Sequence, residues 1–146
     1  MANIDLSSFE DNLKNILQSN STIVNNTTRI TTGMFDIGSV RGIQLYVKAE
    51  PYQNSTESRL LNARRYEIPV NVHMVCRSRT LSNLHSDIRD LYPEIEETIQ
   101  KNNRLNGISN GIISYDVEPY EIDDENGNPE AYILTITVLY DFILTL

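Results

Sequence analysis

The chain has no tryptophan, a single cysteine and only six glycines in 146 residues, and these scarcities exclude several kinds of site. The glycines are scattered singly, so no glycine-rich loop is available to cradle a phosphate. Cys76 cannot form an internal disulfide, and we expect it to be a buried thiol. No apolar run approaches the roughly 20 residues that span a bilayer, so we expect no membrane association.

Positive charge is also scarce. Lysine and arginine number 12 against 20 acidic residues, which gives a net charge of −8. Because tight nucleic-acid binding normally needs a basic patch, this balance argues against a DNA- or RNA-binding protein. It is compatible with a protein that lines a passage through which DNA moves without sticking, and it favours solubility.

The chain does contain long segments that alternate strictly between apolar and other residues. One runs from about Arg65 to Arg77 and another from Ala131 to Leu144. A shorter segment of the same kind covers Gly42–Ala49. Period-two alternation predicts strands that press one face of a sheet against a core. Pro69 cannot donate to a sheet ladder and therefore predicts an edge position or a bulge.

Two segments show helical spacing instead. The first covers about Ser8–Ser19, where Ser7 and Glu10 fit a capping box. The second covers Leu81–Lys101 and carries an apolar stripe at spacings of three and four: Leu81, Leu84, Ile88, Leu91, Ile95 and Ile99. Pro93 falls inside this stripe and predicts a kink or break near Tyr92.

The remaining segments are read as connections and a hairpin. Residues 19–32 are polar, with a short strand near Thr28–Thr32. Strands 112–120 and 131–144 form a hairpin closed by EIDDENGNPE, where Asn126-Gly127 favours a turn. The sequence predicts a single domain, 1–146, of the α/β (α+β) class. We expect a mixed, mainly antiparallel sheet of about four or five strands with two helices packed on it.

The segment EPYQNSTESRLLNARR, residues 50–65, is polar, long and aperiodic, and we expect a long arm in loop form. Leu60 and Leu61 either fold back on the domain or anchor a neighbouring chain. The arm holds the one basic cluster, Arg59, Arg64 and Arg65, whereas Asp123, Asp124 and Glu125 make the hairpin tip acidic. Opposite charges on two patches are compatible with head-to-tail assembly, and equally with simple solubility.

Reactive chemistry is not indicated. His73 and Cys76 are three residues apart in one strand and so lie on opposite faces of the sheet, which excludes a shared zinc site. The acidic tip lacks the closing glutamate of a calcium loop. No nucleophile with a nearby base is recognisable, and helical carboxylates such as Glu94 and Glu97 are read as solvated surface. We therefore predict no catalytic, cofactor-binding or metal-binding residues, and no enzyme.

The order of these elements resembles that of the tail terminator, or tail completion, proteins of long-tailed bacteriophages. The resemblance spans most of the chain. It rests on the helix around Phe9–Leu17, the strands GIQLYVKAEP and RRYEIPVNVHMVCRS, the helix LHSDIRDLYPEIEETI and the closing strand AYILTITVLYDF. It is a similarity of pattern and order rather than of a diagnostic motif, and Pro93 departs from it. Other phage neck, head-completion and baseplate proteins share this pattern, and a small-ligand binder or enzyme is a further alternative.

The resemblance implies a virion structural protein located in the tail or neck and assembled in the host cytoplasm. Such proteins form a homo-oligomeric ring, in this family hexameric, on the last ring of the tail tube protein. They end tail polymerisation and join the tail to a neck or head-completion protein, while DNA passes through the lumen without specific binding. Cofactors and catalytic residues are not implied. Subunit contacts are expected in the arm and the acidic hairpin.

Overall fold

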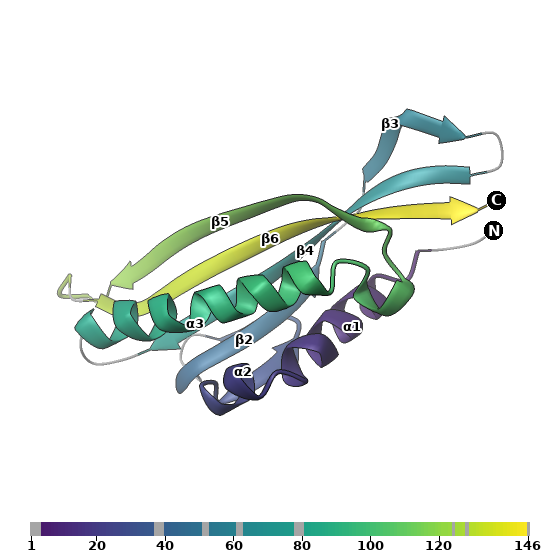
Figure 1. Cartoon of the computed structure of the whole chain (residues 1–146). Coiled ribbons are helices and arrows are strands. Elements are labelled where there is room, and N and C mark those ends of the chain that lie inside the picture. Colours follow the sequence, from purple (N-terminus) through teal and green to yellow (C-terminus); the bar gives the residue numbers. More distant parts are fainter. Residues whose placement is uncertain are drawn as a thin grey trace.

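The computed structural model describes residues 4–36, 40–50, 53–60, 63–77, 81–123, 125–127 and 129–145. Within them a long, twisted sheet carries the helices on one of its faces, while the opposite face has no helix over it (Figure 1). The order of the strands is β1-β2-β4-β6-β5, and β3 pairs with β4. All pairs are antiparallel except β1 with β2. The mixed, mainly antiparallel α+β fold predicted from the sequence is therefore confirmed.

The elements have the following bounds. The helices are α1 Leu6–Gln18, α2 Ser21–Asn25, α3 Leu81–Lys101 and the short 3₁₀ helix η2 Leu105–Gly107. The strands are β1 Arg29–Thr32, β2 Gly42–Ala49, β3 Gln53–Leu60, β4 Ala63–Arg77, β5 Gly111–Asp123 and β6 Pro129–Thr145. The predicted bounds of β2 and α3 match these, and the predicted short strand near residue 30 is β1. In the part of the chain that is described, no helix is long and apolar enough to cross a membrane.

The core lies between the helices and the covered face of the sheet. Strands β4 and β6 pair without a break from Ala63 opposite Thr145 to Arg77 opposite Ala131. The alternate residues of both strands that face the helices are fully buried, and α1 and α3 complete the cluster: Phe9, Leu13, Leu17, Leu45, Val47, Ile68, Val70, Val72, Met74, Ile95, Ile99, Ile136, Val138 and Tyr140. Burial of this much apolar surface is the dominant force holding helices and sheet together.

The helical layer begins differently from the prediction. Asp5, not Ser7, is the N-cap of α1, and its carboxylate accepts a hydrogen bond of 3.1 Å from the Ser7 amide. Helix α2 was not predicted because five polar-rich residues show no period. Asn20 creates it, since its side-chain oxygen accepts from the Ile23 amide while its amide group donates to Glu94 of α3 at 2.8 Å. One side chain thus caps α2 and fastens it to α3.

Pro69 and Pro93, for which the sequence predicted local disruptions, affect their elements differently. A kink or a break was predicted near Tyr92; the break is wrong, because α3 continues through Pro93. Pro93 and the preceding turn at Arg89 are exposed, so water can bind the carbonyl that loses its partner. Pro69 lies inside β4, but the Glu50 amide donates to its carbonyl where β2 has just ended, and β3 begins to pair only at Glu67. The missing donor therefore falls in a gap between two ladders, a local edge.

The arm is the main correction to the predicted fold. Residues 50–65 were expected to form a loop, but Gln53–Leu60 form β3, which pairs with the first residues of β4. The ladder contains an irregularity between Asn54 and Arg59. Because β4 is in turn paired with the end of β6, the arm continues the central sheet past the helices rather than hanging from it (Figure 1). From here on, the arm means β3 together with residues 63–67 of β4.

Candidate interaction surfaces

The arginines predicted as contacts in the arm do not behave alike. Arg65 forms an ion pair with Asp141 of β6, with 2.5 Å between Nε and the carboxylate oxygen. The Asp141 side chain is only 16% exposed, so Arg65 neutralises a mostly buried charge within the subunit. Arg64 is exposed, and no carboxylate of the described residues lies within ion-pair distance of it. Of these two, only Arg64 therefore remains a candidate for contact with another molecule.

The remaining arm residues are placed by the backbone. Arg59 lies opposite Arg64, and Leu60 lies opposite Ala63. Leu61 lies outside the described residues, so its predicted role is not tested. The cluster that the sequence indicated is thus brought together on two adjacent strands, although Arg65 is already occupied by Asp141.

The loop of the acidic hairpin is shorter than predicted. Strand β5 continues to Asp123, and β6 begins at Pro129, so half of the expected loop, residues 121–130, is strand. Of the two predicted turn residues only Gly127 has a positive φ, 79°. Asp123 and Glu125 are exposed, whereas Asp124 lies outside the described residues. Glu130 pairs with Arg77 of β4 at 3.0 Å, which fixes the base of the hairpin.

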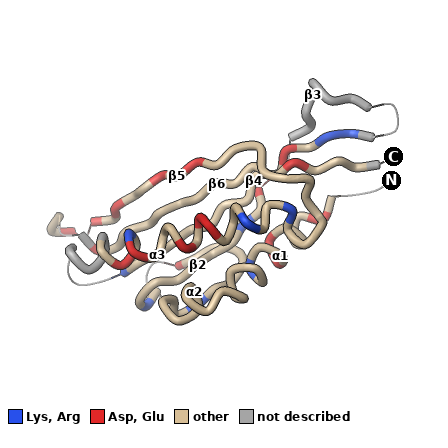
Figure 2. Tube along the Cα trace, viewed as in Figure 1, with Lys and Arg blue, Asp and Glu red and all other residues tan. Residues whose placement is uncertain are grey.

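The two charged regions lie at opposite ends of the molecule (Figure 2). Strand β4 carries the arginines of the arm at one end, and carboxylates follow β5 towards the turn at the other end. The carboxylates of this acidic edge are Asp116, Glu118, Glu121, Asp123 and Glu125, all exposed. The same edge also exposes apolar side chains, Val117 at 38% and Tyr120 at 64%. The structure therefore separates the basic and the acidic patch by the length of the sheet.

Polar side chains on the open face of the sheet are hydrogen-bonded to one another. Thr137 donates to Asn71 at 2.7 Å, and Asn71 donates to Glu50 at 3.3 Å. His73 lies beside this row, with 2.9 Å between its Nδ1 and the Thr135 hydroxyl. Burial lowers the pKa of His73 below the usual value, an effect that the nearby Glu50 carboxylate opposes. These contacts make a hydrated sheet face stable in water without a covering layer.

One corner of the open face is covered by an aromatic contact. The Phe35 ring packs on Tyr46 with 5.3 Å between ring centroids and meets His73 edge-on at 5.5 Å. Tyr46 belongs to a small second cluster with Val40, Val75 and Ile133. The sequence did not indicate this cluster, because Val75 falls on the polar face of β4 and Val40 lies outside the predicted strands.

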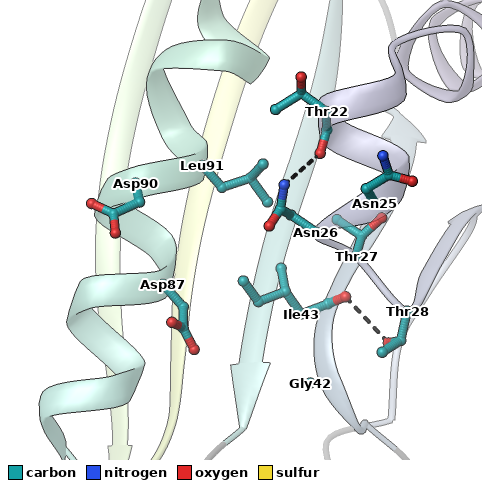
Figure 3. A pocket seen from close by; sticks show the side chains of 10 residues that line it. All are labelled: Thr22, Asn25, Asn26, Thr27, Thr28, Gly42, Ile43, Asp87, Asp90 and Leu91. Atoms are coloured by element: carbon teal, nitrogen blue, oxygen red, sulfur yellow. Dashed lines mark hydrogen bonds between the residues drawn. The ribbon is translucent and has the colours of Figure 1, made fainter.

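A groove of about 530 Å³ lies between α2 and the first half of α3, above the start of β2. Figure 3 shows Asp87 and Asp90 of α3 on one side and the polar residues of α2 on the other. Several of these groups already have partners, since Asn26 donates to the Thr22 carbonyl at 2.7 Å and the Thr28 hydroxyl to the Arg41 carbonyl at 2.5 Å. Several polar groups of the lining, at the end of α2 and in the turn after it, thus hydrogen-bond to the backbone. They do not form a set of converging groups that await a ligand.

Reactive groups are not assembled in the described residues. His73 lies on the open face, and Cys76 is buried on the other, as their spacing predicted. Burial raises the pKa of the Cys76 thiol to about 11, which keeps it protonated at neutral pH and therefore unreactive. Burial also raises the pKa of Tyr140. No group of three or more metal-ligating side chains occurs within the ranges that the structure describes.

The helical carboxylates have structural roles. Glu94 accepts the Asn20 hydrogen bond described above, and Glu97 pairs with Lys101 at 2.6 Å one turn later on α3. The side chains of the Glu97–Lys101 pair are more than half exposed, so water and salt screen this pair and it contributes little to stability.

Comparison with known proteins shows likeness to solved structures but not to known sequences. No protein-family model matches the chain, and no curated protein sequence matches it. The fold is similar to that of a chain in the solved structure titled "Virion of native gene transfer agent (GTA) particle". The superposition has a TM-score of 0.59 and covers 95% of this chain and 99% of the other, at 7% sequence identity. The two chains therefore share a fold over nearly their whole length.

Proposed function

We propose that this protein is a non-enzymatic structural component of a phage-like virion, located in its tail or neck. The observation that carries the proposal is the end-to-end likeness of fold to a chain from a gene transfer agent virion. A match that covers both chains almost completely concerns the whole domain rather than a common motif. The order of elements, which resembles the tail terminator proteins, points the same way from the sequence.

More specifically, we propose that the chain forms a ring, hexameric in the resembling family, that caps the tail tube. The ring ends polymerisation of the tube protein and provides the joint for a neck or head-completion protein. The open sheet face supports a role beside DNA, because its cations are paired within the subunit: Lys48 with Glu50, Arg65 with Asp141 and Arg77 with Glu130. Cations neutralised in this way attract phosphate weakly, so DNA can pass without specific binding.

The test is removal of the gene from the phage-like element that encodes it, followed by electron microscopy of the particles. We expect tails of uncontrolled length that are not joined to heads, and restoration of normal particles when the gene is supplied separately. Purified wild-type particles should contain the protein, detected by mass spectrometry. Normal tail length and head joining without the gene, or absence of the protein from particles, would contradict the proposal.

A second measurement separates the terminator from another joining protein. Antibody labelling of intact particles should place the protein at the junction between tail and head. Labelling at the distal end of the tail would favour a baseplate component on the same fold. Negative-stain images of the purified protein at high concentration should show closed rings, with six-fold symmetry if the ring number of the family applies.

A further inference from the structure

Arg64 in the arm carries a positive charge that no described residue of the subunit neutralises. The register places Arg59 directly opposite Arg64. Arg64 is exposed and has no carboxylate of the described residues within ion-pair distance, in contrast to Arg65 beside it. Arg64 therefore lacks a counter-charge, and an anionic group of another molecule would stabilise the arm.

The acidic end of the sheet carries exposed negative charge at Asp123 and Glu125. Asp123 and Glu125 are exposed, and neither forms an ion pair with a described residue. Both lie where β5 turns into β6, at the end of the sheet away from the arm (Figure 2). Repulsion between neighbouring carboxylates makes this end, too, more stable beside a cation.

The two patches cannot neutralise each other within one subunit. Arg64 pairs with Leu144 and Asp123 pairs with Pro129, so fifteen residues of β6 separate the two positions. At about 3.3 Å per residue this is roughly 50 Å. Screening at physiological salt acts over about 8 Å, so the charges do not interact across the subunit. Only a neighbouring molecule can bring them together.

Pairing of strands between neighbours does not explain the acidic edge. The Asn110 amide donates to the Asp141 carbonyl at 2.7 Å, so the backbone groups of Asp141 and of alternate residues along β6 point to β5. Leu134 belongs to the other set and points away from β5. Pro119 lies opposite Leu134, so the backbone nitrogen and carbonyl of Pro119 point away from β6, to the free edge of β5. Proline has no amide hydrogen, so this position cannot donate to an added strand. Proline and carboxylates on an edge strand are typical protection against strand addition.

We infer that the arm of one subunit binds the acidic end of a second copy of this chain through side-chain charge, with Arg64 on Asp123 and Glu125. The inference rests on the proposed ring, which it supplies with a contact. Two different, complementary patches form a head-to-tail interface, and such an interface closes into a ring or extends into a filament. Because the patches lie at the two ends of one continuous sheet, each subunit carries both halves of the contact.

The test begins with charge reversal, using full-length protein and sedimentation equilibrium. Arg64→Glu and the double variant Asp123→Lys, Glu125→Lys should each weaken self-association at least about tenfold. An equimolar mixture of the two variants should associate again, because the swapped charges are complementary. Arg89→Glu is the matched control, since Arg89 is exposed on α3 and the change of charge is identical; it should associate like the wild type.

Trapping covers the case of weak association in solution. Mixed Ala63→Cys and Asn126→Cys variants keep Arg64, Asp123 and Glu125 in place and should form a disulfide between subunits at low salt. The yield should fall at about 1 M salt, where the screening length is about 3 Å. Cys76 is buried and does not compete. Absence of the mixed disulfide, or failure of the charge-swapped mixture to associate, would overturn the contact.

The contact and the proposed function fail in distinguishable ways. If the charge-swapped mixture associates but the protein is absent from particles, the contact stands and the virion role falls. If removal of the gene gives unjoined, overlong tails while Arg64→Glu supports normal particles, the virion role stands and the contact falls.

Discussion

The two faces of the sheet achieve stability in different ways. On the covered face, side chains of β4 and β6 are fully buried against α1 and α3. On the open face, the alternate residues of the same strands form hydrogen bonds and ion pairs, such as Thr137 with Asn71 and Arg65 with Asp141. The covered face therefore determines whether the domain folds. The open face is stable in water and can contact other molecules without disruption of the core.

Removal of one apolar side chain from each face should give the largest contrast. Ile136 and Leu139 lie on β6, but Ile136 is fully buried beneath the helices and Leu139 is half-buried on the open face. Ile136→Ala should lower the free energy of unfolding by about 2–5 kcal/mol, because it leaves a cavity in a close-packed core. Leu139→Ala should cost about 1 kcal/mol, in proportion to the smaller apolar area that it buries.

Urea denaturation followed by circular dichroism measures both values. Equal losses for the two variants would show that the open face is packed as tightly as the core, which would remove the distinction between the faces.

Breaking the ion pair of the open face should have an intermediate effect. Arg65→Met leaves the mostly buried carboxylate of Asp141 without its partner and should cost about 1–3 kcal/mol of unfolding free energy. Arg64→Met, one residue earlier, removes the same charge from an exposed position and should change stability by less than about 0.5 kcal/mol.

A double-mutant cycle with Asp141→Asn isolates the interaction between Arg65 and Asp141. A coupling energy near zero would mean that Arg65 is as available to a partner molecule as Arg64. The distinction between a paired Arg65 and an unpaired Arg64 would then be wrong.

The smallest predicted effect concerns pH. Burial lowers the pKa of His73 in the folded protein below its value of 6.5 in the unfolded chain. Between these two pKa values the unfolded chain binds more protons, so the free energy of unfolding should fall as the pH drops below about 6.5. His73→Gln should flatten this dependence, measured as the difference in unfolding free energy from the wild type between about pH 5.5 and pH 7.5.

The groups that face His73 bear on this result. Glu50 favours its protonation, Lys48 opposes it, and Phe35 and Thr135 complete its surroundings. Glu50→Gln should therefore make the pH dependence steeper, because the opposing carboxylate is removed. A wild-type stability that stays constant through this range, or that rises on acidification, would contradict the assignment of His73 to a half-buried, uncharged position.

The sequence predicted most of what depends on periodic apolar residues. The bounds of β2 and α3 were correct because alternation and the helical stripe of Leu91, Ile95 and Ile99 extend to their ends. Strand β3 was missed for the opposite reason. Its sequence QNSTESRL has no apolar period, and it is formed by pairing with β4 beyond the core. Pairing with a neighbouring strand leaves no signal in the strand's own composition.

The candidate surfaces were predictable in sign but not in availability. The sequence shows that the arm is basic and the hairpin acidic. It does not show that Asp141, 76 positions away from Arg65, neutralises that residue, or that Asn20 reaches Glu94. Such contacts join residues far apart in the chain, and only the folded arrangement reveals which charges remain for a partner.

The position of β6 has a consequence for how the chain folds. Although it is the latest strand in the order of elements, it lies inside the sheet, between β4 and β5. Its pairing with β4 joins residues as distant as Ala63 and Thr145. During synthesis, β4 therefore exposes an unpaired edge until β6 has left the ribosome, and the core closes only then. We expect slow folding limited by this long-range pairing, with partly made chains prone to aggregate.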